Sequence, residues 1–259
     1  MSIEARYTFA LELIREAGSK ALEYFNARDG LTIKNKGPQD LASEADLNTE
    51  LLIRERLAKA FPEDAFLGEE TPPTAYEEGQ GIWVVDPIDG TQPFCLGLSS
   101  WCVSIGFVKN GVIEFGMVNV PVRGELFAGG RNIPATLNGA PIRVSAAASI
   151  REGLTGTGYS PKSGPQKFMP GFTRLLEAGG MFYRDGSGAI GLCYVAAGRL
   201  VGYFEPVIMS WDALGALGVC AGAGARISDF LGNDGLRKGN GIIAAAPGAY
   251  EEIEAIVRG

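Results

Sequence analysis

Residues 83–94 read W-V-V-D-P-I-D-G-T-Q-P-F, and this stretch is the most informative part of the sequence. The three apolar residues at 83–85 indicate the end of a buried strand. Two carboxylates, Asp86 and Asp89, follow three positions apart, and Gly90 comes directly after the second one. Glycine lets the backbone approach an anion closely, and backbone N–H groups at the start of a loop or helix bind phosphate. The stretch therefore predicts a loop that holds a hard cation beside a phosphate.

The chain of 259 residues contains no histidine. This absence excludes Ser-His-Asp and Cys-His catalysis, phosphohistidine intermediates, and zinc or iron sites that use imidazole ligands. Any metal site must therefore be built mainly from oxygen ligands, which suit Mg²⁺, Mn²⁺ or Ca²⁺.

The composition, with 46% hydrophobic and 20% charged residues, is typical of a soluble globular protein of one large or two small domains. The 30 acidic and 23 basic side chains give a net charge of −7, which argues against a general nucleic-acid-binding surface. No apolar stretch is long enough for a membrane helix, and the first residues do not resemble a secretory signal. We therefore expect a cytoplasmic protein without a membrane partner.

The four cysteines form no C-x-x-C pair and lie in apolar surroundings, so we expect buried, reduced thiols. They are Cys95, Cys102, Cys193 and Cys220, and Cys95 follows the acidic loop closely.

Apolar periodicity and turn residues predict an α/β (α+β) chain of layered sheets and helices, best treated as one catalytic unit over residues 1–259. No internal repeat or linker interrupts it. We expect helices at 3–25, from Ser43 or Glu44 to Phe61, and at 187–197, 211–223 and 249–257. We expect strands at 31–34, 103–108, 112–120, 124–128, 201–205 and 241–245, with a polar loop at 36–38 and a turn at 137–139.

Four separate segments each present an acid in a distinctive setting. Each has an ordinary interpretation on its own: the G-E-E at 68–70 is typical of a solvated turn, the D-P-I-D-G-T at 86–91 is rich in turn formers, and Asp212 is placed to cap a helix. Their combination in one chain favours a shared site. The segments are 36–46, 68–71, 86–91 and 205–212.

Together these segments resemble the signatures of the inositol monophosphatase family of metal-dependent phosphatases. The family pattern W-x-x-D-P-[IL]-D-G-T-x-N-F matches residues 83–94 at all but one position, and W-D-x-A-[AG] is recognisable at 211–215. The elements G-E-E and K-x-x-x-D-[LV]-x-[ST]-x-x-D are present at 68–70 and 36–46. The resemblance spans most of the chain. It implies a layered α/β/α/β/α sandwich of the inositol monophosphatase and fructose-1,6-bisphosphatase type, and commonly a homodimer.

The resemblance also implies a metal cluster of two or three Mg²⁺ ions, with Mn²⁺ as an alternative. Glu69, Asp86 and the backbone carbonyl of Ile88 would hold the first ion. Asp86, Asp89 and Asp212 would hold the second, and Glu69 would share a looser third. Divalent ions neutralise a phosphate, lower the pKa of a bound water and stabilise the leaving oxygen. Sensitivity to lithium is expected from the same resemblance.

The catalytic roles implied by the resemblance fall to Glu69, Thr91 and Asp46. Glu69 and Thr91 would orient the metal-activated water, and Asp46 would hydrogen-bond Thr91 and raise its proton-accepting ability. The phosphate would rest on the N–H groups of Gly90 and Thr91. Attack would be in line, without a covalent phosphoenzyme.

The substrate-binding residues are less marked in the sequence. Lys36 is a loop lysine whose ordinary interpretation is a solvated side chain, although the family pattern places it near the metals. Glu205 precedes Asp212 by seven residues, which is the family's spacing for a residue that binds substrate hydroxyls, and a carboxylate accepts well from a polyol. Its alternative is a surface acid at a strand end. The full expected set is Lys36, Asp89, Gly90, Thr91, Gly186, Ser187, Gly188, Glu205 and Asp212.

Pro93 is where the chain departs from the first signature, because the family usually has Asn there. Proline is tolerated in the first turn of a helix. We therefore expect at most the loss of one hydrogen bond near the metal site, with reduced or retuned activity.

The sequence gives only weak grounds for choosing among the family's substrates. Histidinol-phosphate phosphatases of the family usually carry a G-G-D-C-Y type of segment where this chain has D-G-S-G-A at 185–189, and residues 202–206 look more like the inositol-phosphatase branch. We therefore favour myo-inositol 1-phosphate or a related polyol phosphate. The alternatives are histidinol phosphate, fructose 1,6-bisphosphate and adenosine 3′,5′-bisphosphate. A non-enzymatic alternative is a regulatory partner of the transcription machinery, since fold and metal site alone do not fix function.

Overall fold

The computed structural model describes residues 1–259 except Thr32, Pro38, Gln39, Glu78 and Lys162. The side chains of Asp29, of residues 33–37 and of residues 40–42 also lie outside the described part.

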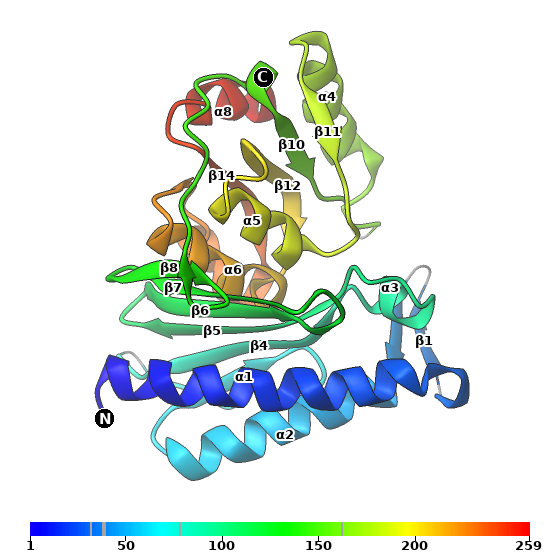
Figure 1. The fold of residues 1–259 in the computed structure, drawn as a ribbon, viewed down its shortest axis with the longest axis vertical. Helices are drawn as coiled ribbons and strands as arrows, with labels where there is room; N and C mark the ends of the chain where they lie inside the picture. The colour runs from blue at the N-terminus through cyan, green and yellow to red at the C-terminus, as the bar shows by residue number, and fades with distance from the viewer. Residues whose placement is uncertain (32, 38–39, 78, 162) are drawn as a thin grey trace.

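A seven-stranded sheet forms the lower half of the molecule in Figure 1. Its order is β3-β4-β5-β6-β7-β8-β9, and only the β3–β4 pair is parallel. The parallel pair brings the ends of β3 and β4 to the same edge, which positions the site described below. The strands are β3 (Ala65–Gly68), β4 (Ile82–Asp89), β5 (Cys102–Lys109), β6 (Val112–Val120), β7 (Glu125–Gly130), β8 (Ile133–Leu137) and β9 (Ala140–Pro141).

A five-stranded sheet forms the upper half, in the order β11-β10-β12-β14-β13. β10 pairs in parallel with both β11 and β12, whereas β14 pairs antiparallel with β12 and β13. The strands are β10 (Leu154–Thr157), β11 (Met181–Tyr183), β12 (Gly202–Ile208), β13 (Arg226–Ile227) and β14 (Asn240–Ala245). A separate hairpin pairs β1 (Ile33–Gly37) with β2 (Asp40–Ser43).

Helices cover both sheets, so the layers alternate as helix, sheet, helix, sheet and helix (Figure 1). The outer face of the seven-stranded sheet carries α1 (Ile3–Asn26) and α2 (Glu44–Ala60), and the layer between the sheets holds α5 (Gly188–Ala196) and α6 (Ser210–Gly222). The outer layer of the upper half is α4 (Pro165–Glu177) with α8 (Tyr250–Arg258). Two short helices, α3 (Thr91–Cys95) and α7 (Gly235–Lys238), complete the set. The predicted α/β/α/β/α sandwich is confirmed.

The helix starts follow from ordinary capping chemistry. Ser2 caps α1 by accepting from the backbone N–H of Ala5 at 3.1 Å. Ser43 and Asp46 form a capping box on α2, in which each side chain satisfies backbone donors at the helix start. Because Asp46 is also a predicted catalytic residue, the start of α2 fixes the position of that carboxylate.

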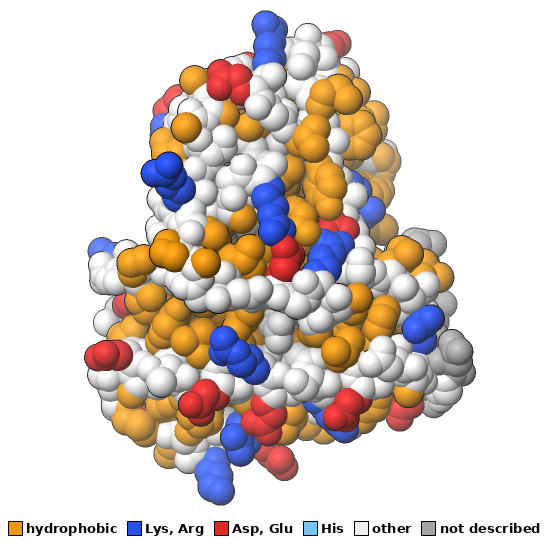
Figure 2. Space-filling model, in the orientation of Figure 1, with side chains coloured by type: hydrophobic (Ala, Val, Ile, Leu, Met, Phe, Trp, Pro, Cys, Tyr) orange, Lys and Arg blue, Asp and Glu red, His pale blue; other side chains and the backbone are white. Residues whose placement is uncertain are grey.

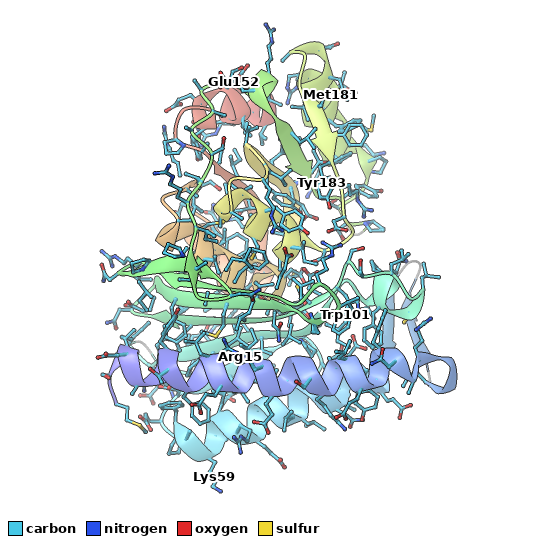
Figure 3. The ribbon with its side chains drawn as sticks, in the orientation of Figure 1. Arg15, Lys59, Trp101, Glu152, Met181 and Tyr183 are labelled. Atoms are coloured by element: carbon cyan, nitrogen blue, oxygen red, sulfur yellow. The ribbon has the colours of Figure 1, made fainter. Side chains whose placement is uncertain are left out.

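Aromatic side chains fill the core between α1, α2 and the seven-stranded sheet. Trp83 lies 4.7 Å, centroid to centroid, from Phe107, and Phe107 stacks on Phe115. Trp101 packs against Phe25 and Phe94 beneath α3 (Figure 3). Each such side chain contributes about 1.5–3 kcal/mol when fully buried, so the strand that carries the acidic loop is anchored at its apolar end.

The predicted strands at 103–108, 112–120 and 124–128, and all five predicted helices, are present within a few residues. The expected strand at 31–34 corresponds to β1, with Thr32 outside the described residues. The polar loop expected at 36–38 was wrong for Lys36 and Gly37, because pairing with β2 extends β1 to Gly37. The sequence analysis missed the short strands β8, β10 and β11, which are 5, 4 and 3 residues long. It also missed α4, which contains an internal proline at Pro170.

Three of the four cysteines are buried and all four are free thiols, but Cys95 is half-buried, so its expected full burial was wrong. α3 is one turn long, which leaves its last residue near the surface. Among the described helices, none has both the length and the apolar character needed to cross a membrane.

Figure 2 shows apolar side chains gathered where α4 and β11 lie in Figure 1. The exposed members of these two elements are Met169, Leu176, Met181 and Phe182.

Candidate active site

Three carboxylates meet where β3, β4 and α6 converge. Glu69 directly follows β3, Asp86 lies in β4, and Asp212 lies in the first turn of α6. One oxygen from each of these side chains lies within 4.8 Å of the other two. The parallel β3–β4 pair delivers the first two acids, and α6 packs across the strands to deliver the third.

Asp86 is the most buried acid of this group, with 1% of its surface exposed. Its Oδ1 accepts a hydrogen bond from the backbone N–H of Ile88 at 2.9 Å, whereas its buried Oδ2 accepts none from the described residues. Burial, followed by the nearby charges of Glu69 and Asp212, raises the pKa of Asp86 well above its ordinary value. A buried carboxylate oxygen without a donor is costly, and a bound cation would satisfy it.

Asp89 ends β4 and contacts the start of α5. Its Oδ2 accepts from the Ser187 hydroxyl at 2.5 Å and from the backbone N–H of Ala189 at 2.8 Å. Burial and the charge of Asp212 raise the pKa of Asp89 to about 7, although the hydrogen bonds oppose that shift. Asp89 therefore links the acid cluster to the Gly186–Gly188 turn that the sequence predicted as substrate-binding.

The structure places Asp46 beside Thr91, as the resemblance implied. Asp46 Oδ2 accepts from the backbone N–H and the hydroxyl of Ser43, at 2.8 and 2.7 Å. The Thr91 hydroxyl lies 3.2 Å from Asp46 Oδ1 and 3.1 Å from the carbonyl oxygen of Ile88, and it donates between them. Burial raises the pKa of Asp46 to about 6. Because the Thr91 proton points toward Asp46 and Ile88, the lone pairs of its oxygen remain available to accept from another molecule.

Gly90 connects β4 to α3 and has a positive φ of 95°. A Cβ at this position would lie 2.5 Å from the carbonyl oxygen of Ser100, so no other residue fits without movement. The backbone therefore turns sharply at the place where the sequence predicted a phosphate cradle. Pro93 lies in α3, and its Cγ would be 3.0 Å from a Cβ on Gly186, so the proline packs against the opposite loop.

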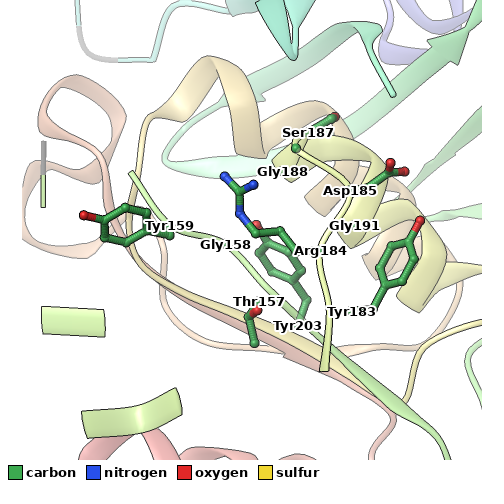
Figure 4. A pocket seen from close by; sticks show the side chains of 11 residues that line it. Thr157, Gly158, Tyr159, Tyr183, Arg184, Asp185, Ser187, Gly188, Gly191 and Tyr203 are labelled. Atoms are coloured by element: carbon green, nitrogen blue, oxygen red, sulfur yellow. The ribbon is translucent and has the colours of Figure 1, made fainter. Parts of the chain in front are cut away.

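An open cleft of about 580 Å³ lies over these groups. Glu69, Gly90 and Thr91 line it on the side of the seven-stranded sheet, and Arg184 and Gly186 line it on the other side. A cavity of about 50 Å³ adjoins the cleft, because both share Tyr159, Arg184, Asp185 and Gly186 (Figure 4).

Glu205 lies in β12 and is 8% exposed. Its Oε2 accepts from the Tyr203 hydroxyl at 2.7 Å. Burial raises the pKa of Glu205 to about 8, with a further contribution from the charges of Asp212 and Asp89. Glu205 does not belong to the described lining of the 580 Å³ cleft. It borders a groove between α4 and β14 instead. Gly188 lines the small cavity, and a Cβ there would lie 3.7 Å from Glu205 Oε2.

Most of the predicted site residues come together around this cleft, and two exceptions stand out. Lys36 lies in β1, but its side chain is outside the described residues. The charges of Asp212 and Asp89 help to raise the pKa of Glu205, but Glu205 is set back from the open cleft. Grouped around the cleft are Asp46, Glu69, Asp86, Ile88, Asp89, Gly90, Thr91, Gly186, Ser187, Gly188 and Asp212.

Three further residues were missed by the sequence analysis: Ser43, Arg184 and Tyr203. Ser43 holds Asp46, Arg184 borders both cavities, and Tyr203 donates to Glu205. Tyr203 had a usable signal, because residues two apart in a strand lie on the same face. Ser43 had one as the Ser or Thr position of the element at 36–46. Asp212 shows why single residues mislead: it accepts from the backbone N–H of Met209 at 3.3 Å as a helix cap and also belongs to the acid cluster.

The donor set fits a hard divalent cation. It is made only of oxygen, it concentrates negative charge, and it leaves Asp86 Oδ2 without a hydrogen bond from the described residues. Mg²⁺ binds through one or two carboxylates together with substrate phosphate, which matches acids at the edge of an open cleft.

Comparison with known proteins gives matches along nearly the whole chain. A sequence model described as the inositol monophosphatase family matches residues 2–258. The Haemophilus influenzae protein named Nus factor SuhB is 34% identical over 248 residues, covering 94% of this chain and 92% of that protein. Inositol-1-monophosphatase from Rhizobium meliloti is 31% identical over 234 residues, covering 90% of this chain and 88% of that protein. The crystal structure of extragenic suppressor protein SuhB from Bartonella henselae has a TM-score of 0.90 at 30% identity and 98% coverage of both chains.

Proposed function

Because this chain belongs to the inositol monophosphatase family, we propose that it is a metal-dependent phosphomonoesterase acting on a small polyol or sugar phosphate. Myo-inositol 1-phosphate is the first candidate substrate, and residues 1–259 act as one catalytic unit. The observation that carries the proposal is the carboxylate cluster around Asp86, which lies beside the Gly90–Thr91 turn at the edge of an open cleft.

The chain's own residues divide the work. One Mg²⁺ would be held by Glu69, Asp86 and the Ile88 carbonyl. A second would be held by Asp86, Asp89 and Asp212, and Glu69 would share a third. When bound, such ions neutralise the phosphate, activate water and stabilise the leaving oxygen. Ser187 and the backbone of Ala189 hold Asp89 in place for this role.

Thr91 and Glu69 would orient the attacking water. The Thr91 oxygen can accept a hydrogen bond from that water because its own proton is directed toward Asp46 and the Ile88 carbonyl. The backbone N–H groups of Gly90 and Thr91 would bind the phosphate at a sharp turn that requires glycine, since a Cβ at position 90 would collide with the Ser100 carbonyl oxygen. Attack on phosphorus would then be in line with the leaving alcohol.

Glu205, with the turn at Gly186, Ser187 and Gly188, would bind the alcohol part of the ester. The polar groups that line the cavity at this turn, among them Thr157, Arg184 and Asp185, support a polyol. Histidinol phosphate, fructose 1,6-bisphosphate and adenosine 3′,5′-bisphosphate are the competing esters.

A homodimer belongs to the same proposal. The exposed apolar side chains on α4 and β11, including Met181 and Phe182, support it, because a monomer rarely exposes a contiguous apolar patch without a partner.

A second candidate function is a regulatory role with the transcription machinery. It is favoured by relatives named Nus factor SuhB, one of which is 34% identical to this chain. The two functions are compatible, since a protein surface and a catalytic cleft need not overlap.

The decisive experiment is a phosphate-release screen with Mg²⁺ over the candidate esters. We expect turnover of a polyol phosphate, inhibition by lithium, and loss of turnover in Asp89→Asn, whereas the surface variant Asp234→Asn should keep full activity. Mg²⁺ alone should also stabilise the protein by about 2.7 kcal/mol at a hundred times its dissociation constant. Folded protein that hydrolyses none of the esters and is not stabilised by Mg²⁺ would contradict the proposal and favour the regulatory candidate.

A further inference from the structure

Tyr203 and Glu205 form a buried pair on one face of β12. Residues two apart in a strand point to the same side, and here the phenol donates to Glu205 Oε2 at 2.7 Å. Tyr203 is 3% exposed and Glu205 is 8% exposed. A hydrogen bond to a buried carboxylate is stronger than one at the surface, because little water competes for it.

Glycine backbone surrounds the pair on two sides. On β10, a Cβ at Gly156 would lie 2.6 Å from the Tyr203 ring, and a Cβ at Gly158, just beyond the strand, would collide with both the Tyr203 hydroxyl and Glu205 Oε2. On α5, a Cβ at Gly191 would lie 2.6 Å from the same ring. The close backbone approach leaves the ring one position, so the phenol oxygen is fixed in space.

The 50 Å³ cavity that adjoins the cleft reaches Tyr203, whose hydroxyl contacts Glu205 Oε2. Tyr203, Gly158 and Gly188 line this cavity, and Figure 4 shows the Tyr203 ring at its wall near Arg184. A Cβ at Gly188 would lie 3.5 Å from the Tyr203 hydroxyl and 3.7 Å from Glu205 Oε2, so the missing side chain keeps this approach open. A cavity of this size holds one or two small polar groups, which suits one hydroxyl of a substrate.

We propose that Tyr203 is a positioning residue that makes Glu205 select for an ester with a hydroxyl at one defined place. The phenol holds the carboxylate through Oε2, and the remaining acceptor positions of the carboxylate are left for the substrate hydroxyl. A carboxylate held at one oxygen cannot rotate to follow a misplaced hydroxyl. This inference rests on the proposed phosphatase function and explains why the site would prefer polyol esters.

The test is Tyr203→Phe, which keeps the ring and its glycine contacts and removes only the hydroxyl. Turnover of myo-inositol 1-phosphate is compared with that of phenyl phosphate, which has no hydroxyl on its alcohol part. We expect kcat/KM for inositol phosphate to fall about tenfold, mainly through KM, as for the loss of one hydrogen bond to a charged group. The kcat/KM for phenyl phosphate should change by less than about twofold, since the substitution does not touch the phosphate site. Tyr194→Phe, which removes a phenol on α5 that contacts Arg123, is the matched control and should not change the ratio.

A double-mutant cycle separates positioning from general damage. In a Glu205→Gln background, Tyr203→Phe should have little further effect on the ratio of the two esters, because the two residues act as one unit. Gly158→Ala should reproduce the loss by displacing the pair. An equal loss for both esters, or an undiminished Tyr203→Phe effect in Glu205→Gln, would overturn the inference. Wild-type protein that hydrolyses inositol phosphate while Tyr203→Phe leaves the ratio unchanged overturns this inference alone. Wild-type protein that hydrolyses none of the candidate esters and is not stabilised by Mg²⁺ overturns the proposed function and this inference with it.

Discussion

Two buried aspartates on the seven-stranded sheet have opposite surroundings. Asp64, just before β3, receives two hydrogen bonds from the Arg6 guanidinium, at 2.6 and 2.7 Å, and a third from the Trp83 indole at 3.1 Å. Asp86, three residues after Trp83, faces other carboxylates and has an oxygen that no described donor reaches. The first acid is neutralised by its own chain, and the second is not.

The difference separates a structural charge from a functional one. A buried acid with an arginine partner fixes two segments to each other, here the start of α1 and the end of the loop after α2. A buried acid among like charges destabilises the fold and is tolerated where a ligand supplies the missing charge. The apolar core around Trp83 lies between the two and holds both in place.

The strongest test of this comparison is Asp86→Asn. We expect phosphatase activity to fall at least about a thousandfold, because a lost cation ligand removes several kcal/mol of transition-state stabilisation. In the absence of metal the variant should be as stable as wild type or more stable, since the pKa of Asp86 is raised by burial and by the Glu69 and Asp212 charges. A raised pKa means that the ionised acid destabilises the fold, increasingly as pH rises above the ordinary value toward the folded one.

Urea unfolding in the presence of a chelator, followed at pH 5 and pH 8, measures this stability. The gain of Asp86→Asn over wild type should be larger at pH 8. A metal-free variant that is clearly less stable than wild type at pH 8 would show that Asp86 is a structural acid like Asp64, and the comparison would fail.

The second test acts on the paired acid. Arg6→Met should lower the free energy of unfolding by about 3–5 kcal/mol, because it leaves Asp64 buried without its charge partner. Activity of the remaining folded protein should be nearly unchanged, since Arg6 lies at the opposite end of the sheet from the cleft. Arg226→Met, which removes an exposed ion pair with Glu251, is the matched control and should cost much less, because water screens an exposed pair. A loss for Arg6→Met no larger than for Arg226→Met would remove the structural half of the comparison.

The sequence predicted the acids of the metal-binding loop better than it predicted Asp64, which is paired with Arg6. Asp86, Asp89 and Gly90 sit in one short segment whose chemistry is visible locally. The partnership of Arg6 with Asp64 spans 58 residues and has no local signature, because two surface-like charges become buried only when α1 packs across the sheet. A local motif can therefore be recognised in the sequence, whereas an ion pair between distant residues cannot.

The same limit applies within the site. The sequence named Glu69 and Asp212, but their approach to Asp86 follows from the parallel β3–β4 pair and from the packing of α6 across the strands. Tyr203 was missed although the two-residue period of a strand pointed to it. The setback of Glu205 from the cleft could not be predicted, because it depends on how closely β10 and α5 approach β12.

Asp185 offers a finer test, because it is paired like Asp64 but lines the cleft. Burial raises its pKa, but two contacts to Arg123, at 2.8 and 3.1 Å, outweigh burial, and the net pKa lies below the ordinary value. An acid with a lowered folded pKa stabilises the protein fully above its unfolded pKa, near 3.9, and loses that contribution as pH falls through the folded pKa. Asp185→Asn should therefore cost on the order of 1 kcal/mol at pH 6, as for a partly exposed pair, and the difference from wild type should shrink below pH 4.

Urea titrations of the metal-free proteins from pH 3 to pH 6 measure that difference, and Arg123→Met should show the same pH dependence because it removes the same pair. The acid cluster titrates equally in all three proteins, so it cancels from the comparison. If the Asp185→Asn difference instead grew as pH fell, Asp185 would have a raised pKa and would belong with Asp86. The uncompensated charge would then extend from the carboxylate cluster to the far wall of the cleft, and Arg123 would no longer mark the boundary between structural and functional acids.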